Sequence, residues 1–590
     1  MEFLVNYNIN TGKGVTPSVI FPSEVATPGS ERFSIKLIEA RGKLYQQIIT
    51  GERFDFLIFG DLIFPKTIRD IEPGKITFLE EHLINRSIHK LKGFFYIIAI
   101  DRFTYKIEIH SSLFNILPLY YFKEGTTVLI STSMKYILDD EKIKLRFSER
   151  YAVEKILFYY SFRDQTIFEG IKLLSSCSFF EIGKDGFSII KSYNPYDFYV
   201  SIPKPWRNSL EELSDIFLSE FENYIPAEPA AISLTGGFDG RIVLSAAIKN
   251  GFAPETYSYG SPNEDDILIP QKIAATLKLK HQSFLLTQEY AKKSFFDDGL
   301  EFLNKTEFSG NISRAHYVYV AKTLSRRFSY LLTGNFGSEI LRSMKYPGVM
   351  ASPSLFALFQ ARKKKDFEDF VKAVPDLKYL NNDLVGSNLQ DVIDEVWDYR
   401  QELPSELSPN QKFYTYIFGE IFRKYFGPEI VFQSNYIINR SPFLDYKFIN
   451  EILKTKNAGI YNNFLEKNPL NRFHGQALYS HIIKKAYPPL LNLKLDKGYK
   501  PVDFLTNFGK AFIIYGYLKR YIANIGITDN PIYSEYYYKE NAFRILSTLN
   551  EAPVLNIGIL KDEIENGTWP FDQTGFVNAL SLNLTYGQIS

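Results

Sequence analysis

Cysteine is nearly absent from this sequence, because Cys177 is the only one among 590 residues. A single cysteine excludes a disulfide within the chain and any zinc site built from several cysteines. The seven histidines form neither an HExxH pair nor another metal-ligand spacing. We therefore expect a protein of a reducing compartment, the cytoplasm, with Cys177 as a buried structural thiol.

An excess of either charge is also missing, since 68 basic residues balance 67 acidic ones to a formal net charge of +1. Such a chain has no field that would gather nucleic acid or an anionic membrane surface. No apolar run approaches the roughly 18 residues of a membrane span, and the opening MEFLVNYNIN lacks the basic start of a signal peptide. The sequence therefore predicts that neither nucleic acid nor a membrane is a partner.

The chain is long enough for at least two domains, and 45% of its residues are hydrophobic. Short aromatic and β-branched runs in the first 200 residues predict strands at 53–64, 93–102, 105–112, 118–122 and 127–133. A stretch rich in proline and aromatic residues follows at 193–208. We therefore predict a sheet-dominated domain over residues 1–200 and a second domain over residues 205–590.

Strands and helices alternate in the second domain. Ser209 and Glu212 predict a capping box at the start of its first helix. Strands are then predicted at 230–235, 255–260, 281–287 and 328–334, separated by helices at 241–249, 265–279, 288–303 and 314–326, with mostly helical pattern beyond residue 350. This order is typical of a doubly wound parallel α/β sheet, whose ligands bind beyond the carboxyl ends of the strands. The segments TGGFDG (235–240) and TGNFGSE (333–339) both fall there.

The segment TGGFDG has the residue types of a phosphate site. Gly236 and Gly237 let a polyanion approach the backbone, Thr235 adds a hydroxyl donor, and the following helix directs its positive end to the same place. Asp239 would repel a phosphate unless a cation lay between them, so it favours magnesium. The alternative is a plain strand-to-helix turn that uses glycine for its backbone conformation. The common nucleotide loops GxxxxGK[ST] and GxGxxG are absent.

Five segments of the second domain match one protein family in order and separation: TGGFDG (235–240), ETYSYG (255–260), YLLTGNFGSEIL (330–341), NRSPFLDYKF (439–448) and DKGYKPV (496–502). They resemble the SGGxDS loop, the next strand, and the LSGxGADEL, VRVPFLDHR and KKGFGVP segments of the asparagine synthetase family, which includes β-lactam synthetase and the lasso-peptide cyclases. The first domain is similar to the glutaminase-like domain of that family at GFFYIIAIDR (93–102), LFNILPLYYF (113–122), ISTSMKYIL (130–138) and DQTIFEGIKLL (164–174).

The resemblance implies an Ntn-hydrolase-like sandwich followed by a PP-loop synthetase domain that uses ATP and Mg²⁺. Asp239 and Glu339 match its magnesium ligands, although the family usually has Asp at the second position; the alternative for Glu339 is an exposed acid near a helix start. Lys497 is the implied catalytic lysine, with Lys494 as the other candidate, and Arg440 is a supporting catalytic residue or, alternatively, part of a structural ion pair with Asp445. The implied ATP-binding residues are Leu234, Thr235, Gly236, Gly237, Asp239, Gly240, Ser258, Gly260 and Gly334.

The sequence departs from the family's glutaminases at three places. Glu2 stands where they have a nucleophilic cysteine, Phe59 replaces the asparagine of their oxyanion segment, and Ser111 and Ser112 replace an arginine and an aspartate. The first domain therefore resembles a retained scaffold, and glutamine is not expected to supply nitrogen. The family's base positions hold Asn335 or Phe336, and Ile438, so a base would come from elsewhere, for example Tyr436, His474 or the substrate.

The leading hypothesis is an ATP-dependent ligase that adenylates a substrate carboxylate, releases pyrophosphate and passes the acyl group to an amine. The partners would be a small molecule or peptide carrying a carboxylate and an amine, with a homodimer or proteins of a biosynthetic pathway as possible further partners. One alternative is an asparagine synthetase supplied with free ammonia. Another is a non-catalytic regulator that only binds nucleotide, although a retained acid at a phosphate site argues against it.

Overall fold

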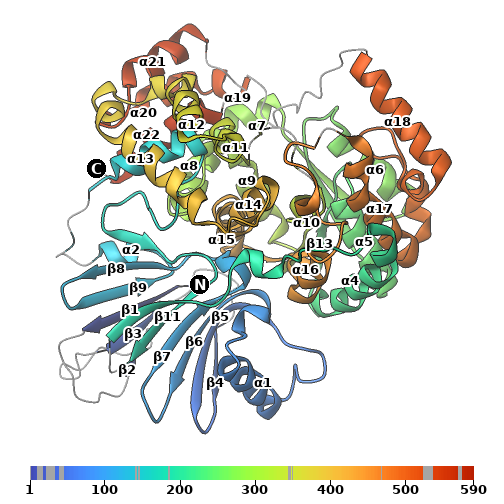
Figure 1. Ribbon diagram of the computed structural model, residues 1–590, viewed down its shortest axis with the longest axis horizontal. Helices are drawn as coiled ribbons and strands as arrows, with labels where there is room; N and C mark the ends of the chain where they lie inside the picture. Colours follow the sequence, from blue (N-terminus) through green and yellow to red (C-terminus); the bar gives the residue numbers. More distant parts are fainter. Residues whose placement is uncertain are drawn as a thin grey trace.

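The computed structural model describes residues 2–8, 18–20, 33–38, 46–139, 143, 146–183, 186–342, 344, 347–348, 350–466, 468–522, 536–568 and 574–589. Two antiparallel-rich sheets, a parallel sheet and a large set of helices make up these residues (Figure 1). Among the residues that the structure describes, no helix is long and apolar enough to cross a membrane.

The first two sheets have six strands each. One has the order β10-β8-β9-β1-β3-β2 and the other β12-β11-β7-β6-β5-β4, with antiparallel neighbours except for the parallel pair β2 and β3. Every strand predicted in the first domain is confirmed within a few residues. The strands are β1 (Glu2–Asn8), β2 (Ser18–Ile20), β3 (Phe33–Ile38), β4 (Gln46–Thr50), β5 (Phe54–Ile63), β6 (Lys92–Asp101), β7 (Ile107–Ser111), β8 (Tyr120–Glu124), β9 (Thr127–Ser131), β10 (Ile171–Leu173), β11 (Ser178–Gly183) and β12 (Gly186–Lys191).

These sheets pack face to face. Phe3 of β1 lies with its ring centroid 4.9 Å from that of Phe59 of β5 and 5.9 Å from that of Tyr96 of β6. Helix α1 (Glu72–Ile84) covers the outer face of the second sheet, where Leu79 joins a separate apolar cluster. Helix α2 (Met134–Leu138) packs on β8 and β9 of the first sheet. Alternating strand residues thus fill both sides of a layered sandwich.

The third sheet is parallel and has the order β15-β14-β13-β16-β17. Its strands are β13 (Ala230–Ser233), β14 (Glu255–Gly260), β15 (His281–Leu285), β16 (Tyr330–Leu332) and β17 (Ile438–Arg440). The connections include the helices α5 (Asp239–Lys249), α6 (Asp265–Leu277), α7 (Gln288–Lys293), α8 (Phe295–Lys305) and α9 (His316–Leu324). This is the predicted doubly wound α/β arrangement.

Helix α4 (Leu210–Tyr224) starts where it was predicted, but the capping box is wrong. The Ser209 hydroxyl donates to the carbonyls of Pro205 and Trp206 at 3.2 and 3.3 Å, and its side chain caps no N–H of α4. The reason is the short 3₁₀ helix η4 (Trp206–Ser209), which runs directly into α4. The Ser209 hydroxyl therefore faces the preceding carbonyls and not the N–H groups of α4.

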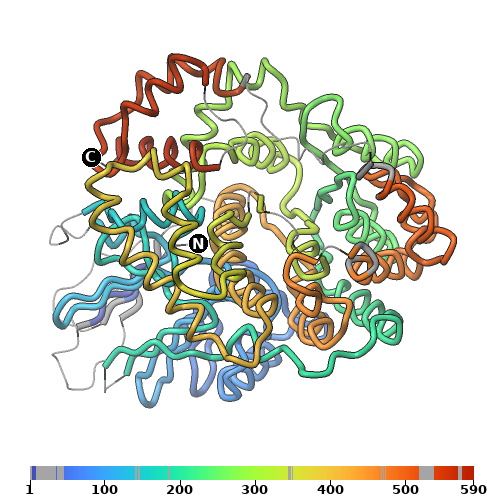
Figure 2. The backbone as a smooth tube through the Cα atoms, turned by 45° about the horizontal axis from the view of Figure 1, so that its top comes forward, coloured from blue at the N-terminus to red at the C-terminus, as the bar shows by residue number. Residues whose placement is uncertain are grey.

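Helices form most of the remaining chain, as predicted. They are α3 (Glu149–Phe158), α10 (Gly337–Leu341), α11 (Pro353–Gln360), α12 (Lys364–Lys372), α13 (Asn382–Glu402), α14 (Pro409–Tyr416), the π-helix η7 (Ile417–Phe426), α15 (Gly427–Ser434), α16 (Tyr446–Ile452), α17 (Pro469–Ala486), α18 (Asn507–Ile522), α19 (Tyr536–Lys539), α20 (Ala542–Thr548), α21 (Ile557–Asn566) and α22 (Thr574–Ile589). Figure 2 shows the last helices beside α11–α13, far away in sequence, and α22 also packs on α3.

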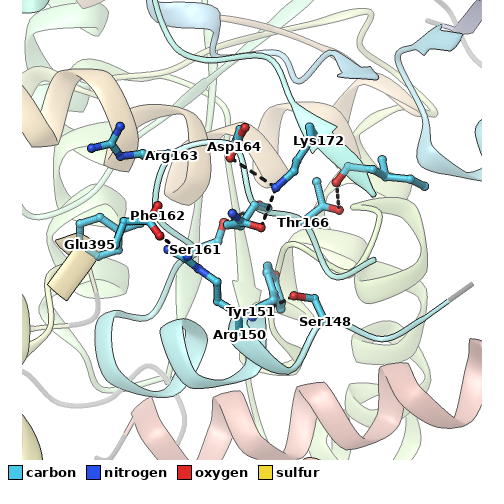
Figure 3. A network of polar contacts seen from close by, with 12 residues as sticks. Ser148, Arg150, Tyr151, Ser161, Phe162, Arg163, Asp164, Thr166, Lys172 and Glu395 are labelled. Atoms are coloured by element: carbon cyan, nitrogen blue, oxygen red, sulfur yellow. Dashed lines mark hydrogen bonds and ion pairs between the residues drawn. The ribbon is translucent and has the colours of Figure 1, made fainter. Parts of the chain in front are cut away.

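Helix α3 joins the first part of the chain to the helical part through a polar network (Figure 3). The Arg150 guanidinium donates to Glu154 at 2.8 Å and to Glu395 of α13, and the Phe162 N–H donates to Glu154 at 2.8 Å. One continuous apolar cluster also runs through both parts. The division at residues 200–205 stays a prediction, because these contacts cross it extensively.

Candidate functional site

The candidate site lies beside two neighbouring strands of the parallel sheet, at the point where the chain leaves them in opposite directions. β13 and β16 are adjacent, and the chain continues from them to opposite sides of the sheet, with β14 beside β13 and β17 beside β16. Such a switch point opens a crevice at the carboxyl ends of the strands. TGGFDG follows β13 and TGNFGSE follows β16, so the structure brings together the two segments that the sequence singled out.

Glycines allow these segments to touch. A Cβ atom on Gly334 would lie 2.6 Å from the Cβ of Asp239, and one on Gly337 would lie 2.7 Å from Asp239 Oδ1. Between them, Phe336 has a φ of 71°, so the backbone turns through the left-handed region. The TGNFG pattern is therefore explained by close approach to Asp239.

Two hydroxyl groups orient the Asp239 carboxylate. Ser338 Oγ donates to Asp239 Oδ2 at 2.5 Å, and the hydroxyl of Tyr479, on α17, donates to Oδ1. Burial raises the pKa of Tyr479 well above its usual range, and the Asp239 charge adds to the shift. Arg342 donates in turn to Ser338 Oγ. None of these three residues was predicted from the sequence as a partner of Asp239. Ser338 and Arg342 flank Glu339 in sequence, whereas nothing local marks Tyr479.

Glu339 provides a second carboxylate beside Asp239. Burial and, after it, the Asp239 charge raise the pKa of Glu339 to about 7, and Arg342 opposes the shift. A cation between the two groups would offset the cost of holding both carboxylates ionised. No group of three His, Cys, Asp or Glu side chains suited to a metal occurs among the described residues. Magnesium here would thus take its remaining oxygens from phosphate and water, as it usually does.

The glycine loop is tightly built around the start of α5. A Cβ on Gly240 would lie 2.4 Å from the carbonyl oxygen of Ser233, so glycine lets the helix begin against the end of β13. The Gly236 N–H donates to Asp266 Oδ1 at 2.8 Å, and the Gly237 N–H donates to Thr235 Oγ1 at 3.3 Å. The N–H groups of Gly236 and Gly237 therefore each donate to a side-chain oxygen. A phosphate bound here would replace these side-chain oxygens as the acceptor.

The segment 493–498 lies directly on this loop. The Asp496 N–H donates to the Gly236 carbonyl at 3.1 Å, and Arg241, fully buried, donates to the carbonyls of Leu493 at 2.7 Å and Gly236 at 3.3 Å. Lys494 and Lys497 are both exposed on this segment, so the choice between them stays open. A cavity of about 230 Å³ lies alongside, lined by Asp265, Ile269, Lys272, Ile273, Leu493, Lys494, Leu495, Asp496 and Gly498.

Arg440 makes a structural ion pair instead of reaching the site. Its guanidinium donates to both carboxylate oxygens of Asp61, on β5, at 2.7 and 2.9 Å, and to the Tyr224 carbonyl at 3.0 Å. Asp445 caps α16 and accepts from Lys92 of β6. The alternative pairing of Arg440 with Asp445 is therefore wrong, and the contacts of Arg440 do not support its predicted catalytic role. Arg440 instead connects β17 of the parallel sheet to the sandwich, and Asp445 connects the start of α16 to the sandwich.

The other predicted nucleotide residues lie along the same edge of the sheet. Leu234 is buried just after β13, and Ser258 Oγ lies 3.1 Å from His281 Nε2. Gly260 has a φ of 154°, and a Cβ there would lie 2.7 Å from the Glu264 carboxylate. Their predicted part in binding ATP is compatible with this placement and stays a prediction.

The residues considered as bases have other partners. The Tyr436 hydroxyl donates to Glu301, and the His474 ring stacks on Trp206 with 5.1 Å between centroids. The Asn335 amide, in the TGNFGSE segment, donates at 3.1 Å to Glu429, a buried carboxylate that the sequence analysis missed.

The first domain offers no activated thiol among the described residues. Cys177 is buried in the turn before β11, and burial raises the pKa of its thiol to about 11. Ser111 donates its hydroxyl to the Leu117 carbonyl at 3.0 Å, and Asp61 is bound to Arg440. Met1 lies outside the described residues. The expected burial of Cys177 is confirmed.

Comparisons with known proteins leave the family open. No family model and no curated protein match the sequence. Among 22 chains of solved structures that match is glutamine phosphoribosylpyrophosphate amidotransferase from B. subtilis, complexed with ADP and GMP; 41% of this chain and 47% of that chain are covered, with 9% identity and a TM-score of 0.16. The match thus spans about half of that enzyme, and its TM-score supports no inference about fold or activity. The resemblance to the asparagine synthetase family stays a prediction.

Proposed function

We propose that this protein activates a substrate carboxylate with MgATP, releasing pyrophosphate, and transfers the acyl group from AMP to an amine. The observation that carries the proposal is that the TGNFGSE segment, which includes Glu339, lies against Asp239 at the switch point of the parallel sheet, beside a glycine loop at a helix N-terminus. Two carboxylates there favour a cation, and a cation beside bare peptide donors favours a polyphosphate.

The residues present fit magnesium and ATP. Asp239 and Glu339 supply the hard oxygen ligands that magnesium prefers. Gly236, Gly237 and the start of α5 supply N–H donors, and the tight contact at Gly240 leaves no room there for a side chain. When bound, MgATP would supply an electrophilic α-phosphate and a pyrophosphate leaving group.

The chain's own groups would prepare this chemistry. Tyr479 and Ser338 orient Asp239 by donating hydrogen bonds to both of its oxygens. Lys497 or Lys494, on the segment that lies on the loop, would place a cation near charge that develops on the phosphate. The attacking amine would come from the substrate or from free solution, because the described part of the first domain contains no reactive thiol for hydrolysing glutamine.

The test is a screen of amino acids and peptides for pyrophosphate release in the presence of MgATP, with hydroxylamine as a general acceptor amine. A true substrate should give equal amounts of AMP, pyrophosphate and acyl hydroxamate. The variant Asp239→Asn serves as the matched control, because it keeps the shape of the side chain and removes its charge. Formation of ADP and orthophosphate from a true substrate would refute the proposal.

A further inference from the structure

Helix α18 has an apolar face that no described residue covers. Phe508, Phe512, Tyr515 and Leu518 recur at helical spacing on it and are 87%, 50%, 65% and 49% exposed. They are four of the fifteen large apolar side chains that are exposed among the described residues. Such a concentration on one helix is typical of a binding surface, because single exposed apolar residues are otherwise scattered.

The opposite side of α18 is tied to the candidate site. Ile513 is buried with Tyr499 and Phe504, and the Tyr499 hydroxyl donates to the Ile513 carbonyl at 3.3 Å. The Phe504 ring lies 5.4 Å from that of Phe238 in the TGGFDG segment. Phe238 stacks in turn on Tyr479, the residue that donates to Asp239. The helix is therefore fixed beside the loop that would bind phosphate.

A cluster of cations borders the first turn of this helix. The Lys510 ammonium and the Arg207 guanidinium each lie 5.1 Å from the centroid of the Trp206 ring, and His474 stacks on the same ring. Burial lowers the pKa of His474, a hydrogen bond with the Lys456 backbone opposes this, and the charges of Lys456, Lys510 and Arg207 lower the pKa further. The sequence of α18 itself, Asn507–Ile522, contains two lysines and an arginine and no acid. The surface therefore combines apolar side chains with the positive charges of Arg207 and Lys510, for which no acidic partner occurs among the described residues.

We propose that the apolar face of α18, together with Arg207 and Lys510 around Trp206, binds a peptide that carries apolar side chains and carboxylates, and that this peptide is the acyl substrate. The last clause rests on the proposed function. A second copy of the chain is a poor occupant, because two α18 helices that both carry positive charge would then face and repel each other. A peptide with carboxylates complements the charge and brings the group to be activated near Asp239.

Binding can be measured without nucleotide on the full chain. Three labelled peptides of equal length are compared by fluorescence anisotropy: one alternating Leu and Glu, one alternating Leu and Lys, and one alternating Ser and Glu. We expect the Leu/Glu peptide to bind at least about tenfold more tightly than the other two, with affinity that falls as salt is added. Equal affinity for all three peptides would overturn the proposal.

Variants locate the surface. Phe512→Glu and Tyr515→Glu should each weaken binding of the Leu/Glu peptide at least about tenfold, since a few exposed aromatic residues carry most of such binding energy. Phe543→Glu, on α20 and 84% exposed, is the matched control and should leave affinity unchanged. Circular dichroism and thermal unfolding check that each variant is folded, and Phe512→Ser repeats the test with a neutral residue. Unchanged affinity in both folded α18 variants would refute the assignment.

Two further arms identify other occupants. Binding to phosphatidylglycerol vesicles that Phe512→Glu abolishes, without binding of any peptide, would overturn the proposal in favour of a membrane surface. Sedimentation showing a dimer that the same variant dissociates would overturn it in favour of a second copy. Because the peptide assay contains no ATP, peptide binding without pyrophosphate release would refute only the proposed function. If a small substrate releases pyrophosphate equally well in the wild type and the α18 variants, and no peptide binds, only the docking surface is refuted.

Discussion

Asp61→Asn is expected to destabilise the protein by about 3–5 kcal/mol, the usual cost of removing one partner from a buried ion pair. The side chains of Arg440 and Asp61 are 8% and 6% exposed, and the pair is bidentate at 2.7 and 2.9 Å. The guanidinium also lies 4.5 Å from the centroid of the Tyr330 ring. Asparagine keeps an acceptor oxygen but leaves the guanidinium charge buried without a counter-charge, so desolvation sets the cost.

The assay is urea unfolding of single and double variants. The combination of Asp61→Leu with Arg440→Met should cost less than Asp61→Asn alone, because no charge then stays buried. Asp55→Asn is the control on the same sheet. Its pair with Arg102, at 2.9 Å, is 24% and 45% exposed, so we expect a loss below about 1 kcal/mol. A loss for Asp61→Asn as small as that of Asp55→Asn, or a double variant as unstable as the sum of its parts, would refute the reasoning.

Four other predictions concern the site and the core. Asp239→Asn and Glu339→Gln should each stay folded and reduce turnover by ~10² or more, with a double variant short of the product of the two losses, and near-normal pyrophosphate release would contradict magnesium binding. Gly334→Ala should reduce turnover similarly, because its Cβ would lie 2.6 Å from the Cβ of Asp239; normal turnover would contradict the loop contact. Glutamine should yield no glutamate above background by coupled assay, and measurable release would contradict the scaffold role of the first domain. Burial lowers the pKa of Lys155 to about 7, so the folded state binds fewer protons than the unfolded state between pH 7 and about 10.5, and the free energy of unfolding should rise with pH in that window. Urea unfolding at pH 7 and pH 9 should show the wild type gaining about 2–3 kcal/mol relative to Lys155→Met. The same difference between the two proteins at both pH values would contradict a buried neutral amine.

Local patterns in the sequence were sufficient for the order of elements in the parallel sheet. The first four strands are short apolar runs followed by turns, and amphipathic helices separate them, so periodicity and turn residues identify them without tertiary information. TGGFDG and TGNFGSE could be placed at strand ends for the same reason. β17 was missed because its three residues, Ile438–Arg440, are too few to show a period, and only pairing with β16 makes them a strand.

Partners distant in sequence were decided by the tertiary structure alone. Asp61 and Arg440 are 379 residues apart, and Tyr479 reaches Asp239 across 240 residues. The sequence by itself determined that Asp239 lies in the turn between a strand and the helix that follows it, which suffices to predict a phosphate or cation site. Which hydroxyl orients that carboxylate, and whether Arg440 serves chemistry or holds two sheets together, depends on how separate elements pack, because a side chain's partner is set by proximity in space and leaves no mark in its own local pattern.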